Sequence, residues 1–498
     1  MKIKSIIKNN KYLGLTLGLV FMLINLLYTP DSLNIIAWRT LGVAILMATW
    51  WLTEALPLPA TSLLPILLFP ILGINTIKET AFNYAHPIIF LFLGGFILGL
   101  AMQYTNLHKR IAFFIISNFK AGPNFIVLGF MISTAFLSMW ISNTATTIMM
   151  LPIAISIISV INKGNIKNQS EKNFAISLIL SIAFSATIGG MATLIGTPPN
   201  AVMAGMLSKI YNYQINFLDW FVIGLPASLL LLPITWFILT KICFPTNKLK
   251  NLDGKLILKE QNKLGKITID EIIVCCIFSF TAFLWITRKW LTNLFEGTLP
   301  HGAITDANIA IGAAILLFIM PSFQNDKKRL INWEVTKDLP WGALILIGGG
   351  LTLASAINSS GLASWIGSMT GGLENTPIIM ITIISIISII ILTELTSNTA
   401  TASTFIPILG ATAIGLGENP LILIIPATLA ASCAFMMPVA TPPNAIAYAS
   451  GYLNIKDMIK AGVWINLISF LIILVIVYTI LGPVFDVKIG EIPDWVKS

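Results

Sequence analysis

The chain has 498 residues, of which 56% are hydrophobic and 10% charged, and its mean hydropathy is +0.87. Soluble domains carry about 25% charged residues, so this composition excludes a soluble globular domain and indicates a protein that crosses a membrane many times. The net charge of +9 would suit a nucleic-acid ligand, but the distribution of the basic residues along the chain argues against one.

The apolar segments predict eleven membrane spans. A helix needs roughly 20 apolar residues to cross the ~30 Å hydrocarbon core of a bilayer. Suitable segments lie at about 12–29, 34–53, 57–73, 86–105, 173–208, 218–243, 270–290, 307–321, 341–360, 421–450 and 461–483. The fifth and the tenth are longer than one span requires and contain tandem prolines, so we expect a broken helix in each.

Two further apolar segments, 124–160 and 376–412, carry a polar motif near their middles. The motif reads SNTATTIMMLP at 142–152 and SNTATASTFIP at 397–407. The two copies are 255 residues apart, and each places a proline ten residues after its serine. Polar residues repeated in this way inside a hydrophobic chain point to a duplicated functional element.

Two more pairs of landmarks flank these motifs. A Gly-Gly pair lies 48 residues before each SNT, at 94–95 and at 349–350. Downstream, GTPPNA at 196–201 is echoed by ATPPNA at 440–445. Three landmarks that recur in one order are unlikely to arise by chance, so the sequence indicates an internally duplicated protein.

The basic residues predict that both SNT segments are re-entrant hairpins rather than full spans. If each segment enters the membrane and leaves on the same side, 23 of the 30 Lys and Arg residues fall on one side. Cytoplasmic loops carry such an excess, so we expect a multi-pass plasma-membrane protein with a cytoplasmic N-terminus and an extracytoplasmic C-terminus. This segregation also explains the positive net charge without a nucleic-acid partner.

This topology divides the chain into two repeats of opposite orientation. The expected units are an N-terminal segment with the first span at 1–33, a first repeat at 34–243, a cytoplasmic linker at 244–269, a second repeat at 270–483 and an extracytoplasmic tail at 484–498. Inverted repeats are typical of secondary transporters, whose sites lie near the midplane between the halves. The predicted fold class is an all-α polytopic membrane protein with about eleven transmembrane helices and two re-entrant hairpins.

The motifs place oxygen atoms where a helix must be interrupted. Pro199 and Pro443 lack an N–H and push the preceding residue out of helical geometry, which leaves carbonyls near Gly196 and Ala440 free. Each SNT supplies hydroxyls and an amide at a hairpin tip, and the helix that starts there directs its positive dipole end toward the tip. One tip and one broken helix together form a cage of neutral oxygens suited to a small cation such as Na⁺.

The duplication supplies two such cages, and between them lie Ser, Thr and Asn donors and two helix N-termini suited to an anion. Lys and Arg are absent from all four motifs. A dianion held there depends on bound cations for compensation, because an unpaired charge is unfavourable in a low-dielectric site. The pattern therefore predicts cation-coupled transport of a dianion.

Other interpretations of these residues fit less well. Small and hydroxylated residues also let membrane helices pack closely, but that role does not require paired motifs in opposite orientations. A membrane enzyme would need an activated base or a metal near one interface, and a channel would need a continuous polar path. No Walker-type phosphate-binding motif is present. We expect structural roles for Glu54 and Glu394, the latter because the first copy has no acid in the matching region.

At these motifs, and at WWLTEALPLPATSLLPILLFP at 50–70, the chain resembles the divalent anion–sodium symporter (DASS) family, the INDY-type dicarboxylate and citrate carriers. The resemblance covers nearly the full length. It implies a homodimer of a transporter, not an enzyme. Each protomer would have a scaffold domain and a transport domain that holds both hairpins and both broken helices and moves like an elevator.

By motif match, the resemblance also implies two sodium sites and one substrate site. The first sodium site involves Ser138, Ser142, Asn143 and Gly196. The second involves Thr393, Thr396, Asn398 and Ala440, with backbone oxygens from Thr396 and Ala440. Substrate carboxylates are expected to meet Asn143, Thr144, Asn398 and Thr399, while Pro442 shapes the pocket and its selectivity.

The leading hypothesis is Na⁺-coupled uptake of a C4-dicarboxylate such as succinate, fumarate or malate. The hydroxyls at Ser138 and Thr393 favour symport. An anion exchanger for dicarboxylate, citrate or tartrate is the main alternative, because some members of the family are exchangers without sodium coupling. A sulfate symporter is a third possibility.

Overall fold

The structure is a computed structural model, and it is built from helices. It describes residues 2–30, 33–119, 122–161, 168–246, 261–262, 264–300, 302–324, 329–369, 372 and 376–497. Within these ranges the only extended pairing is an isolated bridge between Glu296 and Leu299. Most of the linker predicted at 244–269 lies outside the described residues.

The N-terminal half of the chain forms helices that agree in type with the predicted spans. They are α1 (Lys2–Leu27), α2 (Ile35–Thr53), α3 (Leu58–Thr61), α4 (Leu64–Ile71), α5 (Ile77–Phe82), η1 (Asn83–Ala85), α6 (Pro87–Tyr104), α7 (Leu107–Ser117), α8 (Pro123–Ser138), α9 (Asn143–Ile161), α10 (Gln169–Met191), α11 (Pro198–Tyr211), α12 (Phe217–Phe237) and the π-helix η2 (Ile238–Cys243).

The C-terminal half follows the same pattern. Its elements are α14 (Ile269–Leu294), α15 (Asp306–Ile319), η3 (Trp333–Asp338), α16 (Trp341–Ser359), α17 (Leu362–Ser368), α18 (Ile378–Leu395), α19 (Asn398–Gly415), α20 (Leu421–Ala431), α21 (Pro442–Ala449), α22 (Ile455–Phe485) and α23 (Asp494–Lys497).

Helix starts follow local signals in the sequence. Asn34 caps α2 by accepting a hydrogen bond from Ala37 N at 2.7 Å. Thr268 and Glu271 form a reciprocal capping box at the start of α14. Helices α6, α8, α11 and α21 begin at prolines. The first N–H groups of a helix have no acceptor within the helix, so a proline there removes no hydrogen bond. These ends are therefore determined by neighbouring residues.

The segment 57–73, predicted as one span, is instead two short helices. Helix α3 ends at Thr61, and α4 begins three residues further on at Leu64, with Pro65 in its first turn. Because Pro65 disfavours helical geometry at the residue before it and donates no hydrogen bond, a continuous helix through this point is unfavourable. A hydropathy profile does not show this interruption, because the residues on both sides of it are apolar.

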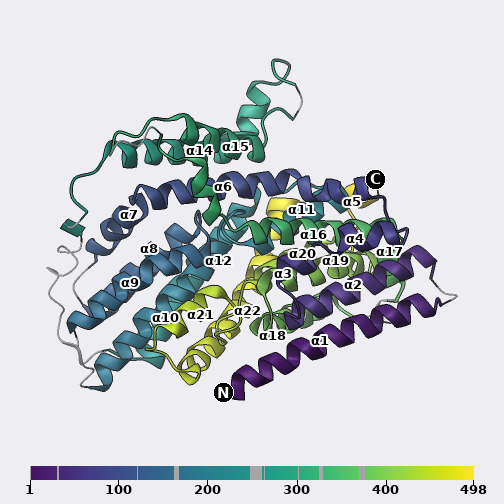
Figure 1. The fold of residues 1–498 in the computed structure, drawn as a ribbon, viewed down its shortest axis with the longest axis horizontal. Helices are drawn as coiled ribbons and strands as arrows, with labels where there is room; N and C mark the ends of the chain where they lie inside the picture. Colours follow the sequence, from purple (N-terminus) through teal and green to yellow (C-terminus); the bar gives the residue numbers. More distant parts are fainter. Residues whose placement is uncertain are drawn as a thin grey trace.

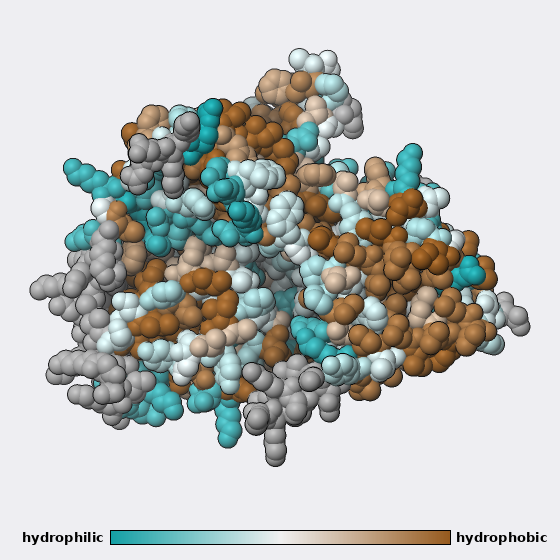
Figure 2. All heavy atoms as spheres, viewed as in Figure 1, coloured by the Kyte–Doolittle hydropathy of each residue, from teal (hydrophilic) through white to brown (hydrophobic). Residues whose placement is uncertain are grey.

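Eight helical segments in the described ranges are long and apolar enough to cross a membrane: α2, Ile77–Tyr104, α10, Phe217–Cys243, α14, α16, α18 and α22. Shorter apolar helices include α8, α9, α15 and α20. Large apolar side chains are exposed along α1, α14 and α22, and Figure 2 shows hydrophobic residues covering much of the right-hand part of the surface, where α1 and α2 lie. Exposed apolar surface on this scale suits contact with lipid.

The two halves of the chain are interleaved rather than side by side (Figure 1). Helix α8 packs along α10, and α15 packs along α6. Helix α10 of the first half contacts α21 of the second, while α11 contacts α16 and α19. Contacts between helices so far apart in sequence bring the duplicated motifs into one central region.

Helix α10 lies at the centre of the protein. Every residue from Phe174 to Met191 is buried, whereas α1 lies at the periphery against α2 (Figure 1). Helix α10 stops at Met191 and the chain resumes as α11 at Pro198. The corresponding interruption in the second half separates α20, which ends at Ala431, from α21, which begins at Pro442. Each interrupted helix therefore reaches the buried interior as non-helical backbone.

Candidate cation and anion sites

Both SNT motifs lie at the tips of helical hairpins. Helix α8 ends at Ser138 and α9 begins at Asn143; helix α18 ends at Leu395 and α19 begins at Asn398. The asparagine of each motif is thus the first residue of the returning helix. Because the first N–H groups of a helix have no helical acceptor, both tips present hydrogen-bond donors and the positive end of a helix dipole.

The first tip gathers three oxygen atoms around one amide. The Ser138 Oγ lies 2.7 Å from the Asn143 Oδ1 and 2.7 Å from the carbonyl oxygen of Ala186 in α10. The same Asn143 oxygen faces the carbonyl oxygens of Ala186 and Gly196, and turning the amide over would let its nitrogen donate to them at 3.0 and 3.2 Å. Converging oxygens of this kind are the ligand set that a hard cation prefers.

The second tip repeats this arrangement. The Thr393 Oγ1 lies 2.8 Å from the Asn398 Oδ1 and 2.7 Å from the carbonyl oxygen of Ala431 at the end of α20. Thr393 and Asn398 follow Ser138 and Asn143 by the same 255 residues that separate the motifs. A hydroxyl, an amide and a carbonyl of the interrupted helix therefore meet in both halves of the protein.

The asparagines of the two TPPN tetrads hold the interrupted segments in place. Asn200 Nδ2 donates to the carbonyl oxygen of Thr193 at 2.8 Å. In the second copy, Asn444 Nδ2 donates to Ala434 O at 3.0 Å and to Met437 O at 3.1 Å. The sequence argument used the prolines of these tetrads and missed the asparagines. The sequence does mark these asparagines, because an amide side chain inside an apolar segment must find hydrogen-bond partners when it is buried.

Close approach of α10 to the first tip requires glycine. A Cβ at Gly190 would lie 2.3 Å from the Asn143 Oδ1, and a Cβ at Gly196 would lie 2.4 Å from the carbonyl oxygen of Gly190. Any larger residue would push the interrupted helix away from the amide. Gly190 is therefore a residue of the site that the motifs alone did not indicate.

The structure places some of the predicted ligands together and leaves others apart. Ser142 accepts a hydrogen bond from Ala145 N at 3.3 Å and so caps α9. The Thr396 hydroxyl contacts Leu392 O at 2.9 Å and the Thr401 hydroxyl at 2.7 Å, so only its backbone oxygen remains for a ligand. No hydrogen bond among the described residues joins Asn398 to Thr396 or to the buried Ala440, and these two remain predicted ligands.

The predicted anion-binding residues sit just beyond the tips. Thr144 is half-buried and Thr399 is buried, and neither hydroxyl makes a hydrogen bond to another described residue. Pro442 is exposed, whereas the next residue, Pro443, is buried. The two hydroxyls are thus free to donate to an anion. Pro442 offers an exposed ring at the start of α21.

Glu394 lies beside the second tip, and the structure shows its contacts. Its side chain is buried and accepts hydrogen bonds from the backbone N–H groups of Phe435, Met436 and Met437 at 2.7 to 3.0 Å. Asn466 of α22 donates a further bond at 2.7 Å. Every contact is a donor facing the carboxyl group, which suits the ionised form. Glu394 therefore stabilises the non-helical segment between α20 and α21.

No group of three His, Cys, Asp or Glu side chains in the described part of the chain could hold a metal ion. The oxygens that converge at the tips are instead neutral hydroxyl, amide and carbonyl groups. Neutral oxygens without thiolate or imidazole ligands suit a hard cation rather than a transition metal.

Comparison with known proteins adds independent evidence. The family described as the sodium:sulfate symporter transmembrane region matches residues 9–485. The sodium-dependent dicarboxylate transporter SdcS of Staphylococcus aureus strain USA300 is 44% identical over 486 residues, which cover 96% of this chain and 93% of that protein. SdcS of strain MRSA252 is 44% identical over 497 residues, which cover 98% of this chain and 95% of that protein.

Two solved structures share the fold at low sequence identity. The Alcanivorax borkumensis transporter YdaH superimposes with a TM-score of 0.59 and 13% identity, over 81% of this chain and 87% of that one. Neisseria gonorrhoeae MtrF, from a class of antimetabolite efflux pumps, gives a TM-score of 0.58 and 12% identity, over 90% and 95%. At these identities the likeness concerns the fold alone.

Proposed function

Because the chain belongs to the sodium:sulfate symporter transmembrane family, we propose that it couples the inward flow of Na⁺ to the uptake of a C4-dicarboxylate such as succinate, fumarate or malate. The chain is a multi-pass membrane transporter rather than an enzyme. Its relatives at 44% identity are named sodium-dependent dicarboxylate transporters, which supports both the coupling ion and the substrate class.

The observation that carries this proposal is the pair of matching oxygen clusters at the two tips. Ser138 with Asn143, and Thr393 with Asn398, each meet a carbonyl of an interrupted helix within 2.8 Å. A Na⁺ ion at each cluster would accept these oxygens as ligands and separate groups that otherwise share one hydroxyl proton. The duplicated geometry therefore supports at least two sodium ions per transport cycle.

The substrate is proposed to bind between the two sodium ions. One carboxylate would accept hydrogen bonds from Asn143, Thr144 and the start of α9, and the other from Asn398, Thr399 and the start of α19. Pro442 would line the same space. Since no Lys or Arg belongs to either tip, the positive charge that balances the dianion must come largely from the bound ions.

Coupling follows from this electrostatic arrangement. Without sodium, two carboxylates in a low-dielectric site would be compensated only by helix dipoles and neutral donors, which is unfavourable. Without substrate, the charges of two bound cations would likewise lack compensation. When the sodium ions and the dianion are bound together, their charges neutralise one another. The fully loaded and the empty transporter are therefore the two states that can carry the site across the membrane at low desolvation energy.

We further propose the arrangement of the chain in the membrane. The repeats 34–243 and 270–483 would insert with opposite orientation in a plasma membrane, with the N-terminus in the cytoplasm and the C-terminus outside. Two protomers would form a homodimer around fixed scaffold helices. The hairpins α8–α9 and α18–α19 would travel with the interrupted helices as an elevator.

A second candidate function is sulfate symport, which the description of the family itself favours. The neutral hydroxyl and amide donors at the tips would also accept a tetrahedral dianion. A dicarboxylate spans a greater length than sulfate, and two separate sets of donors, one per tip, match two separate carboxylates better than one compact anion. This is the reason for ranking the dicarboxylate first.

Flux through reconstituted protein tests the proposal. Purified protein in proteoliposomes should accumulate radiolabelled succinate when Na⁺ is outside and should not do so with K⁺ or choline in its place. Unlabelled fumarate and malate should compete, whereas sulfate should compete poorly. Counterflow of succinate in the complete absence of sodium would show exchange instead, and accumulation of sulfate but not succinate would refute the substrate assignment.

A further inference from the structure

Outside the oxygen clusters, the first turn of α12 joins two groups of helices that pack mainly among themselves. Helices α14 and α15 pack on each other and against α6, whereas α12 packs against α10 and α22. The boundary between these groups, here called the seam, is crossed where Phe217 and Asp219 of α12 meet the end of α14 and the start of α15. The seam thus separates the helices around the first tip from α6, α14 and α15.

Two charged contacts cross the seam. The Lys289 Nζ at the end of α14 lies 2.6 Å from the Asp219 Oδ1. Asp306 at the start of α15 accepts the backbone N–H of Phe217 at 3.0 Å, and its side chain also pairs with Arg288 at 3.1 Å. Each contact joins the N-terminal end of α12 to α14 or α15.

Aromatic rings continue the same contact toward the first tip. The Phe217 ring stacks on Trp285 of α14, with centroids 4.9 Å apart, and on Trp140, with centroids 5.9 Å apart. Trp140 lies two residues before Ser142 of the first SNT motif, and its ring meets that of Phe278 edge-on with centroids 4.8 Å apart. Displacement of the first tip relative to α14 would therefore separate stacked rings at the seam.

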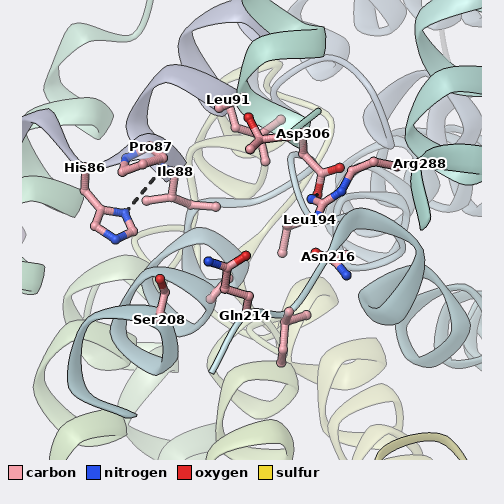
Figure 3. A pocket seen from close by; sticks show the side chains of 14 residues that line it. His86, Pro87, Ile88, Leu91, Leu194, Ser208, Gln214, Asn216, Arg288 and Asp306 are labelled. Carbon is pink, nitrogen blue, oxygen red and sulfur yellow. Dashed lines mark hydrogen bonds and ion pairs between the residues drawn. The ribbon is translucent and has the colours of Figure 1, made fainter. Parts of the chain in front are cut away.

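The seam also contains features that weaken it as an interface. A cavity of about 140 Å³ lies there, lined by α6, α11, α14, α15 and the segment 214–216. Figure 3 shows Arg288 and Asp306 meeting on one side of this cavity, with Gln214 and Asn216 on another. The Arg288 Nε and the Asp306 Oδ1 are buried without a hydrogen-bond partner among the described residues. A cavity of this size takes the place of packing contacts between the helices, and unsatisfied buried polar atoms cost free energy, so both features weaken the interface.

We propose that Asp219 and Lys289, together with Asp306 and the N–H of Phe217, form a latch that holds the seam in the arrangement described here and opens during the transport cycle. This inference rests on the proposed function, since a transporter that alternates access must slide one group of helices along another. A few direct contacts beside a cavity and a short aromatic stack suit an interface that must break and re-form. The latch residues lie outside the oxygen clusters, so they would set the balance between conformations without contacting sodium or substrate.

The accessibility of the cavity to a polar thiol reagent tests the latch. Ala307 lines the cavity and is 9% exposed, so a cysteine placed there, with Cys243, Cys275, Cys276 and Cys433 replaced, reports opening of the seam. The full-length protein in lipid nanodiscs, where both faces are accessible, is treated with a polar maleimide and the labelling rate is measured. A second reporter, Ser208→Cys, also lines the cavity and guards against an effect confined to position 307.

Charge reversal provides the perturbation. Lys289→Asp and Asp219→Lys should each raise the labelling rate of both reporters by about two- to five-fold, the range expected for a partly exposed ion pair. The double reversal restores the pair with opposite polarity and should bring the rate below that of either single reversal. It should stop short of the parent's rate, because Asp219 also accepts the backbone N–H of Asn216 at 3.1 Å in the capping box of α12, and that bond stays lost. The matched control is Lys488→Asp, which breaks the exposed ion pair with Glu491 in the C-terminal tail and should leave both rates unchanged.

The outcomes separate the latch from the proposed function. Unchanged labelling in both single reversals, or a double reversal as fast as the singles, would overturn the latch even if the parent transports succinate with sodium. A parent that fails to transport succinate but shows restored labelling in the double reversal would leave the latch intact and refute the proposed substrate. Size-exclusion profiles of all variants establish that the proteins remain folded.

Discussion

Replacing Glu394 with glutamine tests how strongly one buried carboxyl group supports the second cation cluster. The side chain sits directly after Thr393, and its two oxygens receive three backbone N–H groups of the segment between α20 and α21 as well as Asn466. Glutamine has nearly the same shape but presents an oxygen on one side only. The substitution therefore changes hydrogen bonding with little change in packing.

The magnitude follows from the contacts. The Oε1 receives Phe435 N, Met436 N and Asn466, while the Oε2 receives Met437 N and shares Met436 N. In its less disruptive orientation, glutamine keeps the first set and turns an amide nitrogen toward Met437 N. One partly buried N–H then lacks an acceptor, which costs about 1–3 kcal/mol, and the remaining bonds lose their charge assistance.

Two measurements detect this change. The melting temperature of the purified protein in detergent should fall by several degrees. Half-maximal succinate uptake should require about five-fold or more Na⁺, because a loosened segment no longer fixes the end of α20 beside Thr393. Glu54→Gln is the matched control, since the Glu54 side chain is half exposed and its one ion pair with a described residue is the 3.8 Å contact with Lys11, worth about 0–1 kcal/mol. A Glu394→Gln protein with the melting temperature and sodium dependence of the parent would refute the argument.

Three further predictions concern the tips and the topology. Asn143→Ala or Asn398→Ala should abolish uptake and remove the thermal stabilisation that Na⁺ gives the parent; either variant with unchanged sodium dependence contradicts the cation assignment. Thr399→Ala should raise the KM for succinate roughly ten- to 150-fold, because a hydrogen bond to a charged group contributes about 1.5–3 kcal/mol. Thr399→Ser keeps the hydroxyl and should largely preserve the KM for succinate. Inhibition by butyrate as strong as that by unlabelled succinate would disprove the binding of one carboxylate at each tip. Single cysteines at Asn168 and Gly372 should react with an impermeant reagent from opposite sides of the membrane, and labelling from the same side rules out the inverted repeat.

Much of the architecture could be predicted because it depends on local composition. Hydropathy identifies the membrane helices since each must bury its own backbone hydrogen bonds in lipid. The prolines of GTPPNA and ATPPNA predict where α11 and α21 begin, because a proline at the start of a helix removes no bond. The spacing of Ser138 and Thr393 from the asparagines of their motifs is likewise readable from the chain, since it spans only five residues.

Only the tertiary structure decided which distant groups complete these elements. The carbonyls of Ala186 and Ala431 reach the tip hydroxyls because α10 and α20 stop beside the hairpins, and no residue type marks a backbone carbonyl in sequence. Gly190 matters because Asn143 approaches its α-carbon. The partners of Glu394 lie about 40 and 72 residues further along the chain. Such contacts depend on how helices pack across the whole molecule, whereas motifs and periodicity report only what neighbouring residues can do.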